Sequence, residues 1–581
     1  MGPDRMTLDD ANTQLTAPGQ IFETEHALVN GVDLTVWKNA PATLRQILDL
    51  SQRYGDLEFL VYEDQRYTFS EHYAIVATLA HRLGALVTKG QRVAIAARNL
   101  PQWAMAFWAS VTVGAIVTPL NAWWTSDELS YGLTDSASSL LFVDEERLER
   151  VYELIDELPD LATIVVLGDP HHLVARTHPR THPRVAIVDF AEFLGPIDHT
   201  TPPEVDLLAD DDATMFYTSG TTGHPKGAVA SHRNIITNFM NLWFSAHRSA
   251  LRDGVTPDPS TPAPQNVALL NVPFFHATGC YAVLIPGTAV GTKIVLMHHF
   301  DAGRALEIIE RERVALIGGV PTIAMQIIDH PDFEKFDTSS VTSIAYGGAP
   351  APPELVTRLR AHFPLGQPSN GYGLTETSAA LASNTGADYA AKPSSCGPCY
   401  PVNEAVVVPE GYGGDEPGED IVRGPDVLGE LWVKGPNIIR GYWNKPEATA
   451  KAFTKSGWLR TGDIARIDDE GFIYIVDRAK DMIIRGGENV YSVIVEAAIF
   501  EHPDVQDCAV VGVPHPTLGE EVAAVVVLRP GRVIEAEEIS RHVAARLAKF
   551  EVPTKVFFRS DDLPRNPQGK VLKRELRDSL V

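Results

Sequence analysis

Residues 217–227 read YTSGTTGHPKG, a run of hydroxyl groups and glycines that follows a strand-like stretch. Glycine lets backbone amides approach a phosphate closely, hydroxyl groups donate hydrogen bonds to it, and a lysine adds positive charge. The run therefore predicts a phosphate-binding loop. It is not a Walker A motif, because Lys226 is followed by Gly227 where that motif has serine or threonine. A P-loop kinase is disfavoured for this reason.

On both sides of this loop, short apolar runs alternate with segments of helix length. Strands separated in this way by helices are typical of βαβ units, whose sheets are covered on both faces. We therefore predict an α/β protein with a large N-terminal domain built from such units. The runs are RVAIAAR (92–98), AIVTPL (115–120), SLLFVDE (139–145), ATIVVLG (162–168), TKIVLM (292–297), VALIGGV (314–320) and TSIAYGG (342–348).

The sequence changes character after this series. VLGELWVKG (427–435) and GFIYIVD (471–477) are typical of antiparallel strands and predict a small β subdomain. From residue 478 to 581 the chain has 15 Lys and Arg against 16 Asp and Glu, so nearly all of the net charge of -26 lies before it. Strand-like and helical runs in this part predict a separate small α+β domain. We expect domains at 1–477 and 478–581.

Composition excludes several classes of protein. An excess of 75 acidic over 49 basic side chains disfavours binding to nucleic acid or to anionic membranes. The segments 103–120 and 259–292 are poor in charge, but glycine and proline break both, so we expect no transmembrane segment. Four cysteines in so long a chain, without the apolar stretch of a signal peptide, favour a reducing, cytoplasmic location.

Two patterns invite other chemistry. His171, His172, His178 and His182 are concentrated in residues 169–184, but their spacing matches no closed set of metal ligands. We interpret this stretch as a surface insertion, without deciding whether these histidines bind anything. The CGPC run at 396–399 has the spacing of a thioredoxin-like redox site, yet no small βαβ unit surrounds it, and we disfavour a redox function.

Further motifs follow the phosphate loop in a recognisable order. They are NVPFFHATG (271–279), YGGAP (346–350), NGYGLTET (370–377), GELWVKGPNIIRGYWN (429–444), GWLRTGD (457–463), DRAKDMIIRGGENVY (477–491) and PRNPQGK (564–570). Together with YTSGTTGHPKG, this series resembles the adenylate-forming superfamily, which contains acyl-CoA synthetases, luciferases and the adenylation domains of peptide synthetases. The resemblance implies a large N-terminal domain and a small mobile C-terminal lid, with a hinge near Lys480.

The resemblance also implies roles for the matched positions. It places catalysis on Lys570, Glu376, His276 and Thr218, and Mg2+ on Glu376 and Thr221. Asp463 and Arg478 would bind the ribose, and Gly486 and Gly487 would line the path of the pantetheine arm. The other expected nucleotide contacts are Thr218, Ser219, Gly220, Thr221, Thr222, Gly223, Lys226, Gly348, Ala349, Pro350, Asn370, Gly371, Tyr372, Gly373, Thr375, Lys480 and Lys570.

The implied reaction is the ATP-dependent activation of a carboxylic acid. A carboxylate is a poor electrophile, so its oxygen must become a leaving group, and an acyl-adenylate provides one. Transfer to CoA would then give acyl-CoA, AMP and diphosphate. An acyl-AMP ligase or a luciferase-like member with a different acceptor is the alternative, and the resemblance leaves a homodimer open. Gly318 and Gly319, with Tyr372 where acetate enzymes have tryptophan, favour a medium or long fatty acid or a bulky ring acid.

Overall fold

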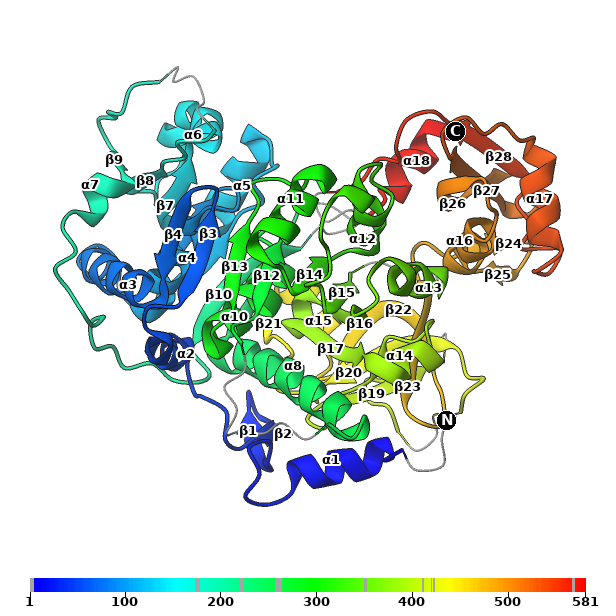
Figure 1. Cartoon of the computed structure of the whole chain (residues 1–581), viewed down its shortest axis with the longest axis horizontal. Helices are drawn as coiled ribbons and strands as arrows, with labels where there is room; N and C mark the ends of the chain where they lie inside the picture. Colours follow the sequence, from blue (N-terminus) through cyan, green and yellow to red (C-terminus); the bar gives the residue numbers. More distant parts are fainter. Residues whose placement is uncertain are drawn as a thin grey trace.

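Two eight-stranded sheets form the body of the protein, and two five-stranded sheets follow later in the chain (Figure 1). The structure, a computed structural model, describes residues 5–172, 178–218, 224–255, 264–348, 353–409, 412–418, 421, 424–566 and 570–580. A hairpin near the N-terminus, β1 (Thr24–Val29) and β2 (Val32–Trp37), precedes the large sheets. The predicted α/β class is confirmed.

The first large sheet carries the phosphate-loop motif. Its central strands are parallel, and β11 pairs antiparallel with β10 on one side. In spatial order the strands are β21 (Gly441–Tyr442), β11 (Lys226–Ser231), β10 (Asp212–Thr218), β6 (Ile116–Pro119), β5 (Arg92–Ala96), β7 (Ser138–Asp144), β8 (Thr163–Leu167) and β9 (Ala186–Asp189).

The second large sheet is parallel except at its two edges. All seven predicted apolar runs, counted over both sheets, begin and end within two residues of the bounds of an observed strand. In spatial order the strands are β17 (Ala379–Asn384), β16 (Gln367–Leu374), β15 (Ser343–Gly347), β14 (Leu316–Gly319), β12 (Val267–Leu270), β13 (Lys293–Leu296), β3 (Glu58–Tyr62) and β4 (Gln65–Thr68).

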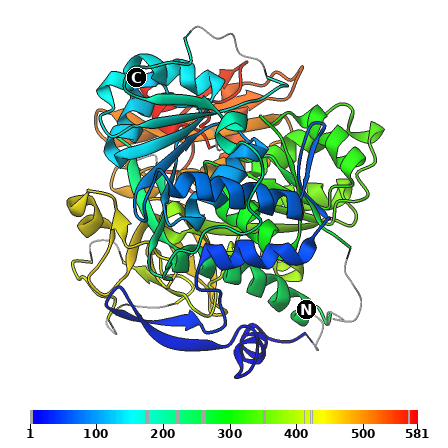
Figure 2. The same cartoon turned by 90° about the vertical axis from the view of Figure 1, so that its left-hand side faces the viewer.

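Helices fill the space between the two large sheets and cover their outer faces. Nearly every side chain of α4 is buried, because one core cluster joins it to strands of both sheets. In Figure 2 the blue helices, which include α4, cross the middle of the molecule. The helices are α1 (Leu8–Thr16), α2 (Leu44–Ser51), α3 (Phe69–Gly84), α4 (Pro101–Thr112), α5 (Ser126–Ser136), α6 (Glu145–Val151), α7 (Phe190–Leu194), α8 (His232–Arg252), α9 (Ala277–Gly279), α10 (Ile285–Val290), α11 (Ala302–Glu312), α12 (Pro321–Ile328), α13 (Pro353–His362), α14 (Gly386–Ala391) and α15 (Pro446–Ala452).

The apolar stretch at 103–120 contains most of α4 followed by β6, and the predicted break falls at Gly114 between them. Gly114 joins the two elements with a φ of 76°, in the left-handed region that favours glycine. Across the described residues, no helix has both the length and the apolar character needed to cross a membrane.

A third sheet forms the predicted β subdomain, and a fourth belongs to the C-terminal unit, which lies at one end of the long axis (Figure 1). The third runs β18 (Gly397–Pro398), β23 (Phe472–Arg478), β22 (Leu459–Ile467), β20 (Gly429–Lys434) and β19 (Glu404–Val408). The C-terminal unit contains β24 (Ile483–Arg485), β25 (Glu488–Val490), α16 (Ser492–Phe500), β26 (Val505–His515), β27 (Gly519–Leu528), α17 (Ala536–Ala544), β28 (Lys555–Arg559) and α18 (Lys573–Leu580).

Candidate active site

The phosphate-loop motif connects two neighbouring strands. β10 ends at Thr218 and β11 begins at Lys226, and these two residues face each other in the antiparallel register. Ser219, Gly220, Thr221, Thr222 and Gly223 lie outside the described residues. The ammonium of Lys226 lies 4.9 Å from the centre of the Tyr442 ring.

Glu376 lies on the same side of the site. It sits in a short 3-10 turn, Thr375–Thr377, directly after β16. The Tyr442 hydroxyl donates a hydrogen bond to Glu376 Oε1 at 2.7 Å, so one tyrosine contacts both Glu376 and Lys226. Tyr442 belongs to the IIRGYWN part of a quoted motif, but no pattern in the sequence assigns it a role. The Glu376 carboxylate offers an oxygen ligand for a metal ion, and the Lys226 ammonium offers a hydrogen-bond donor for phosphate oxygens.

A buried ion pair forms the second part of the site. Asp463 on β22 and Arg478 at the end of β23 are register partners, and Arg478 Nε lies 2.9 Å from Asp463 Oδ1. The Tyr372 hydroxyl donates to Asp463 Oδ2 at 2.6 Å. Asp463 is 2% exposed. Burial, followed by the neighbouring Asp463 charge, raises the pKa of Tyr372, so its hydroxyl stays a donor.

The charge of Lys570, in the C-terminal unit, is affected by this pair. Its backbone is held by two hydrogen bonds with Asn566: Lys570 N donates to Asn566 Oδ1 at 2.9 Å and Asn566 N donates to Lys570 O at 2.8 Å. Burial, and then the positive charges of Arg478 and Lys480, lower the pKa of Lys570 to about 8, against the opposing effect of Asp463. The lysine is therefore close enough to the ion pair for their charges to interact.

Glycines allow close backbone approaches beside the expected adenine position. Asn370, Gly371, Tyr372 and Gly373 lie on β16. A Cβ on Gly373 would stand 1.6 Å from Ala379 O, where the register of β16 and β17 shifts. Gly348 has a φ of 74°, and Ala349 and Pro350 lie outside the described residues.

The expected acyl pocket includes residues of β14 and β15. A narrow cavity is lined by Gly318, Gly319, Ile323 and Ala345, among others, and has no space wide enough for a water molecule. The structure therefore does not display an open pocket there. His276 caps the short helix α9, where its Nδ1 accepts a hydrogen bond from Thr278 N at 3.3 Å.

Asn271 lies next to Gly319, which lines this cavity, and no role was expected for it from the sequence. The residue is 7% exposed, and both polar atoms of its amide are buried without a hydrogen-bond partner. A Cβ built on Gly319 would lie 3.4 Å from Asn271 Oδ1. Buried amides are nearly always hydrogen-bonded, so an unpaired one beside a pocket marks a place where a ligand or water bonds.

Gly486 and Gly487 form the tight turn between β24 and β25. Their φ values of 63° and 90° match a type I′ hairpin turn, which by itself favours glycine at both positions. Gly486 N donates to Leu518 O at 2.7 Å. Lys480 lies in the turn before this hairpin, where burial lowers its pKa.

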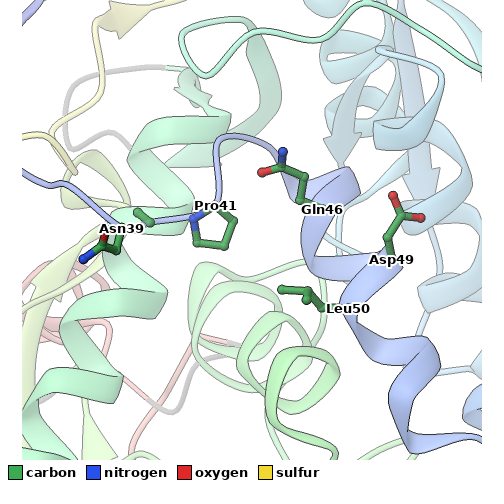
Figure 3. Close-up of a pocket in the computed structure, with 6 residues that line it drawn as sticks. Asn39, Pro41, Gln46, Asp49 and Leu50 are labelled. Atoms are coloured by element: carbon green, nitrogen blue, oxygen red, sulfur yellow. The ribbon is translucent and has the colours of Figure 1, made fainter. Parts of the chain in front are cut away.

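An open hollow of about 450 Å3 lies elsewhere, along α2 and the segment before it (Figure 3). Gln46, Asp49 and Leu50 come from the helix and Asn39 and Pro41 from the preceding segment. Asp49 is already paired with Arg45 and accepts from Tyr73. The hollow contains none of the expected site residues.

The CGPC run is not at a helix N-terminus, where a redox site of this kind would lie. Gly397 and Pro398 form β18, and both cysteines are free thiols. Burial raises the pKa of Cys399 to about 12 and raises that of Cys396 further, which keeps both thiols protonated. The structure thus agrees with the interpretation that disfavoured redox chemistry.

Comparison with known proteins identifies the family. The AMP-binding enzyme model matches residues 47–443, and the model of the AMP-binding enzyme C-terminal domain matches residues 494–570. The chain belongs to the AMP-binding enzyme family. A feruloyl-CoA synthase of Amycolatopsis sp is 35% identical over 515 residues, covering 88% of this chain and 93% of that protein.

A further relative and a solved structure support the same family assignment for this AMP-binding enzyme. A long-chain-fatty-acid–CoA ligase of Bacillus subtilis (strain 168) is 33% identical over 565 residues, with 92% of this chain and 94% of the relative covered. The crystal structure of ATP-bound MatB from Rhodopseudomonas palustris is 28% identical, with 92% and 99% covered and a TM-score of 0.77. The chain is an AMP-forming acid–CoA ligase of the adenylate-forming superfamily, and it uses ATP, CoA and a carboxylic acid.

Proposed function

We propose that the enzyme adenylates its acid with Lys570 in the position described above and then transfers the acyl group to CoA. The observation that carries this is the buried Asp463–Arg478 ion pair, whose two charges both act on the ammonium of Lys570. Asp463 would accept hydrogen bonds from the ribose hydroxyls and Arg478 would donate to the sugar. Lys570 would stabilise the negative charge that develops where the carboxylate attacks the α-phosphate.

Glu376 and the phosphate loop would serve the pyrophosphate side. The carboxylate of Glu376, oriented by Tyr442, suits Mg2+, a cation that prefers oxygen ligands. When bound with ATP, Mg2+ would neutralise phosphate charge. Lys226 and the hydroxyls that follow Thr218 would bind the phosphate oxygens. His276, next to the pocket, would border the acyl path.

The direct test measures products. With ATP, Mg2+, CoA and an accepted acid, we expect AMP and pyrophosphate in equal amounts, and sustained turnover only when CoA is present. Omission of CoA should leave a single round of acyl-adenylate and pyrophosphate. ADP without AMP would contradict the proposal, and sustained pyrophosphate release without CoA would favour another acceptor.

We propose a medium or long fatty acid or a bulky ring acid as the substrate. Gly318 and Gly319 add no side chain to the wall of the cavity, so rearrangement of other lining side chains, such as Ile323, would open it without moving the backbone. The value of kcat/KM should be at least tenfold higher for octanoate or a ring acid than for acetate, equivalent to about 1.4 kcal/mol. Equal values would reject the open-pocket interpretation.

Asn271 narrows the choice of substrate further, because it favours an acid that carries a hydroxyl or carbonyl group. Its unpaired amide would gain a partner from such a group and would stay unpaired beside a plain alkyl chain. The test compares a hydroxylated ring acid with the same ring lacking the hydroxyl. The wild type should prefer the hydroxylated acid, and Asn271→Leu should lose that preference while keeping octanoate activity. An unchanged preference in the variant would remove Asn271 from the acid site.

The small domain at 478–581 would act as a lid that turns about Lys480. A network of buried polar groups spans this hinge, because Ser492 N and Oγ donate to Asp477 and Lys573 donates to Ser492 Oγ.

We place the enzyme in the cytoplasm, since all four cysteines are free thiols, which fits a reducing compartment. The homodimer stays a prediction that sedimentation velocity can check.

A further inference from the structure

Three histidines gather on the surface, although they are far apart in the sequence. His172 follows β8 of the first large sheet, and His298 and His299 follow β13 of the second. Each offers one ring nitrogen, and the three nitrogens lie within 4.8 Å of one another. Among the described residues, no other group of three or more His, Cys, Asp or Glu side chains meets this condition. The sequence alone does not reveal this group, because along the chain His172 is close only to the other histidines of residues 169–184.

The surroundings of His172 prepare it for a ligand. Its Nδ1 lies 3.0 Å from Asp169 Oδ2, and the Tyr62 hydroxyl donates to the same oxygen at 2.8 Å. A carboxylate on one ring nitrogen holds the proton there and leaves the other nitrogen with a free lone pair. Histidine ligands of metal ions in proteins commonly have such a carboxylate partner. The side chain of Asp169 is 7% exposed, so this partner is fixed in place.

His298 supplies an independent observation. Its Nδ1 is buried and has no hydrogen-bond partner, although the side chain as a whole is 17% exposed. A buried ring nitrogen without a partner loses free energy that a bond to a ligand would restore. Asp169 also lies near this ring, with Oδ2 3.9 Å from His298 Nε2, and its negative charge favours a cation.

We infer that His172, His298 and His299 form a binding site for one transition-metal ion. Neutral imidazoles suit Zn2+, Cu2+, Ni2+ and Co2+, whereas Mg2+ prefers oxygen, so this site would be distinct from the nucleotide's Mg2+. Bonds of about 2.0–2.1 Å to a tetrahedral ion place ligand nitrogens about 3.3 Å apart. The rings of His172 and His298 now stack at 3.9 Å between centres, so they must turn out of the stack to bind. The side chain of His172 is 37% exposed and has room to do so.

The ion would hold the ends of two sheets together. Its effect is therefore expected on stability, with no part in adenylation, and the inference does not rest on the proposed function. The probe is Zn2+, titrated by calorimetry into the full chain without a histidine tag after dialysis against a chelator. We expect one ion per chain with a Kd at or below 1 µM. A Kd of 1 µM corresponds to about 8 kcal/mol of binding free energy. Zn2+ should also raise the Tm.

Variants locate the site. His299→Ala removes an exposed ligand, and this variant should fold normally. His172→Ala removes the ligand that follows β8. Each variant should weaken Zn2+ binding at least tenfold. The control His26→Gln changes a histidine whose side chain is 75% exposed and that is not part of this group, and it should bind as the wild type does. Glu376→Gln should also bind Zn2+ normally. No binding to the wild type, or unchanged binding in both His172→Ala and His299→Ala, would overturn the inference.

Discussion

The charge of Lys570 depends on pH in the physiological range, because burial and neighbouring positive charges lower its pKa to about 8. Its pKa of about 8 means that the ammonium loses its proton as the pH rises through 8, whereas an ordinary lysine would stay charged. If the charge stabilises the adenylation transition state, kcat/KM for acid-dependent pyrophosphate exchange falls above pH 8. Arginine stays protonated, so Lys570→Arg should retain a weaker activity whose decline at high pH is absent. The same decline in both enzymes would assign it to another group.

Tyr442 extends the set of site residues beyond those that the motifs suggested. Tyr442→Phe keeps the ring beside Lys226 and removes only the hydrogen bond to Glu376. A hydrogen bond to a charged group contributes about 1.5–3 kcal/mol, so we expect the rate of pyrophosphate exchange to fall by tenfold or more. The Tm should change little. Tyr474→Phe removes a comparable bond to Asp468 and serves as the control, with activity expected to stay near that of the wild type.

Site residues could be predicted where they belong to a motif with recognisable chemistry. They could not be predicted where a residue from a distant part of the chain contacts the motif. Asp463 and Arg478 each belong to a quoted motif, and the β-hairpin that joins them makes their pairing a local consequence of the register. Tyr442 reaches Glu376 from another sheet, and no pattern in the sequence reports that contact. His298 and His299 meet His172 for the same reason, through the packing of two sheets.

At the scale of elements, the meeting of β16 and β17 depends on Gly373. A Cβ there would stand 1.6 Å from the carbonyl oxygen of Ala379, a backbone atom that cannot move without displacing its strand. Gly373→Ala should therefore lower the free energy of unfolding by about 1–3 kcal/mol or more, observed as a lower Tm. Gly168→Ala is the matched control, because no atom lies within 4 Å of a Cβ at that position. An unchanged Tm for Gly373→Ala would mean that the two strands separate freely.

The apolar runs predicted the strands well, since a parallel strand covered on both faces must be apolar throughout. Helix ends were less predictable. The AEEISRHVAARLA stretch (536–548) has the pattern of a helix throughout, whereas α17 ends at Ala544. A glycine in a motif can be needed either for the backbone conformation or for a ligand. Gly486 and Gly487 satisfy a type I′ turn, so their presence alone does not reveal a role in the pantetheine path.

At the scale of the whole molecule, the proposed lid would take a different position in each half-reaction, and two variants can test this. Lys570→Ala should slow acyl-adenylate formation by about 10²–10³, the range for losing one preorganised donor. Thioester formation from prepared acyl-adenylate and CoA should continue near the wild-type rate, because Lys570 would have moved away in the second position. Equal slowing of both steps with an unchanged Tm would contradict the two-position assignment.

Gly486→Asn should show the opposite pattern. Asparagine is tolerated at the first central position of a type I′ turn, so the hairpin should survive while a side chain is added to its surface. If that backbone borders the pantetheine path, pyrophosphate exchange continues and thioester formation falls. The comparison is decisive because a general folding defect would reduce both half-reactions in both variants, whereas a turning lid predicts reciprocal losses. The hinge network must then open during each cycle, since Asp477 lies before Lys480 and its partner Ser492 lies after it. Wild-type thioester formation in a correctly folded Gly486→Asn variant would show that the hairpin glycines serve only the turn.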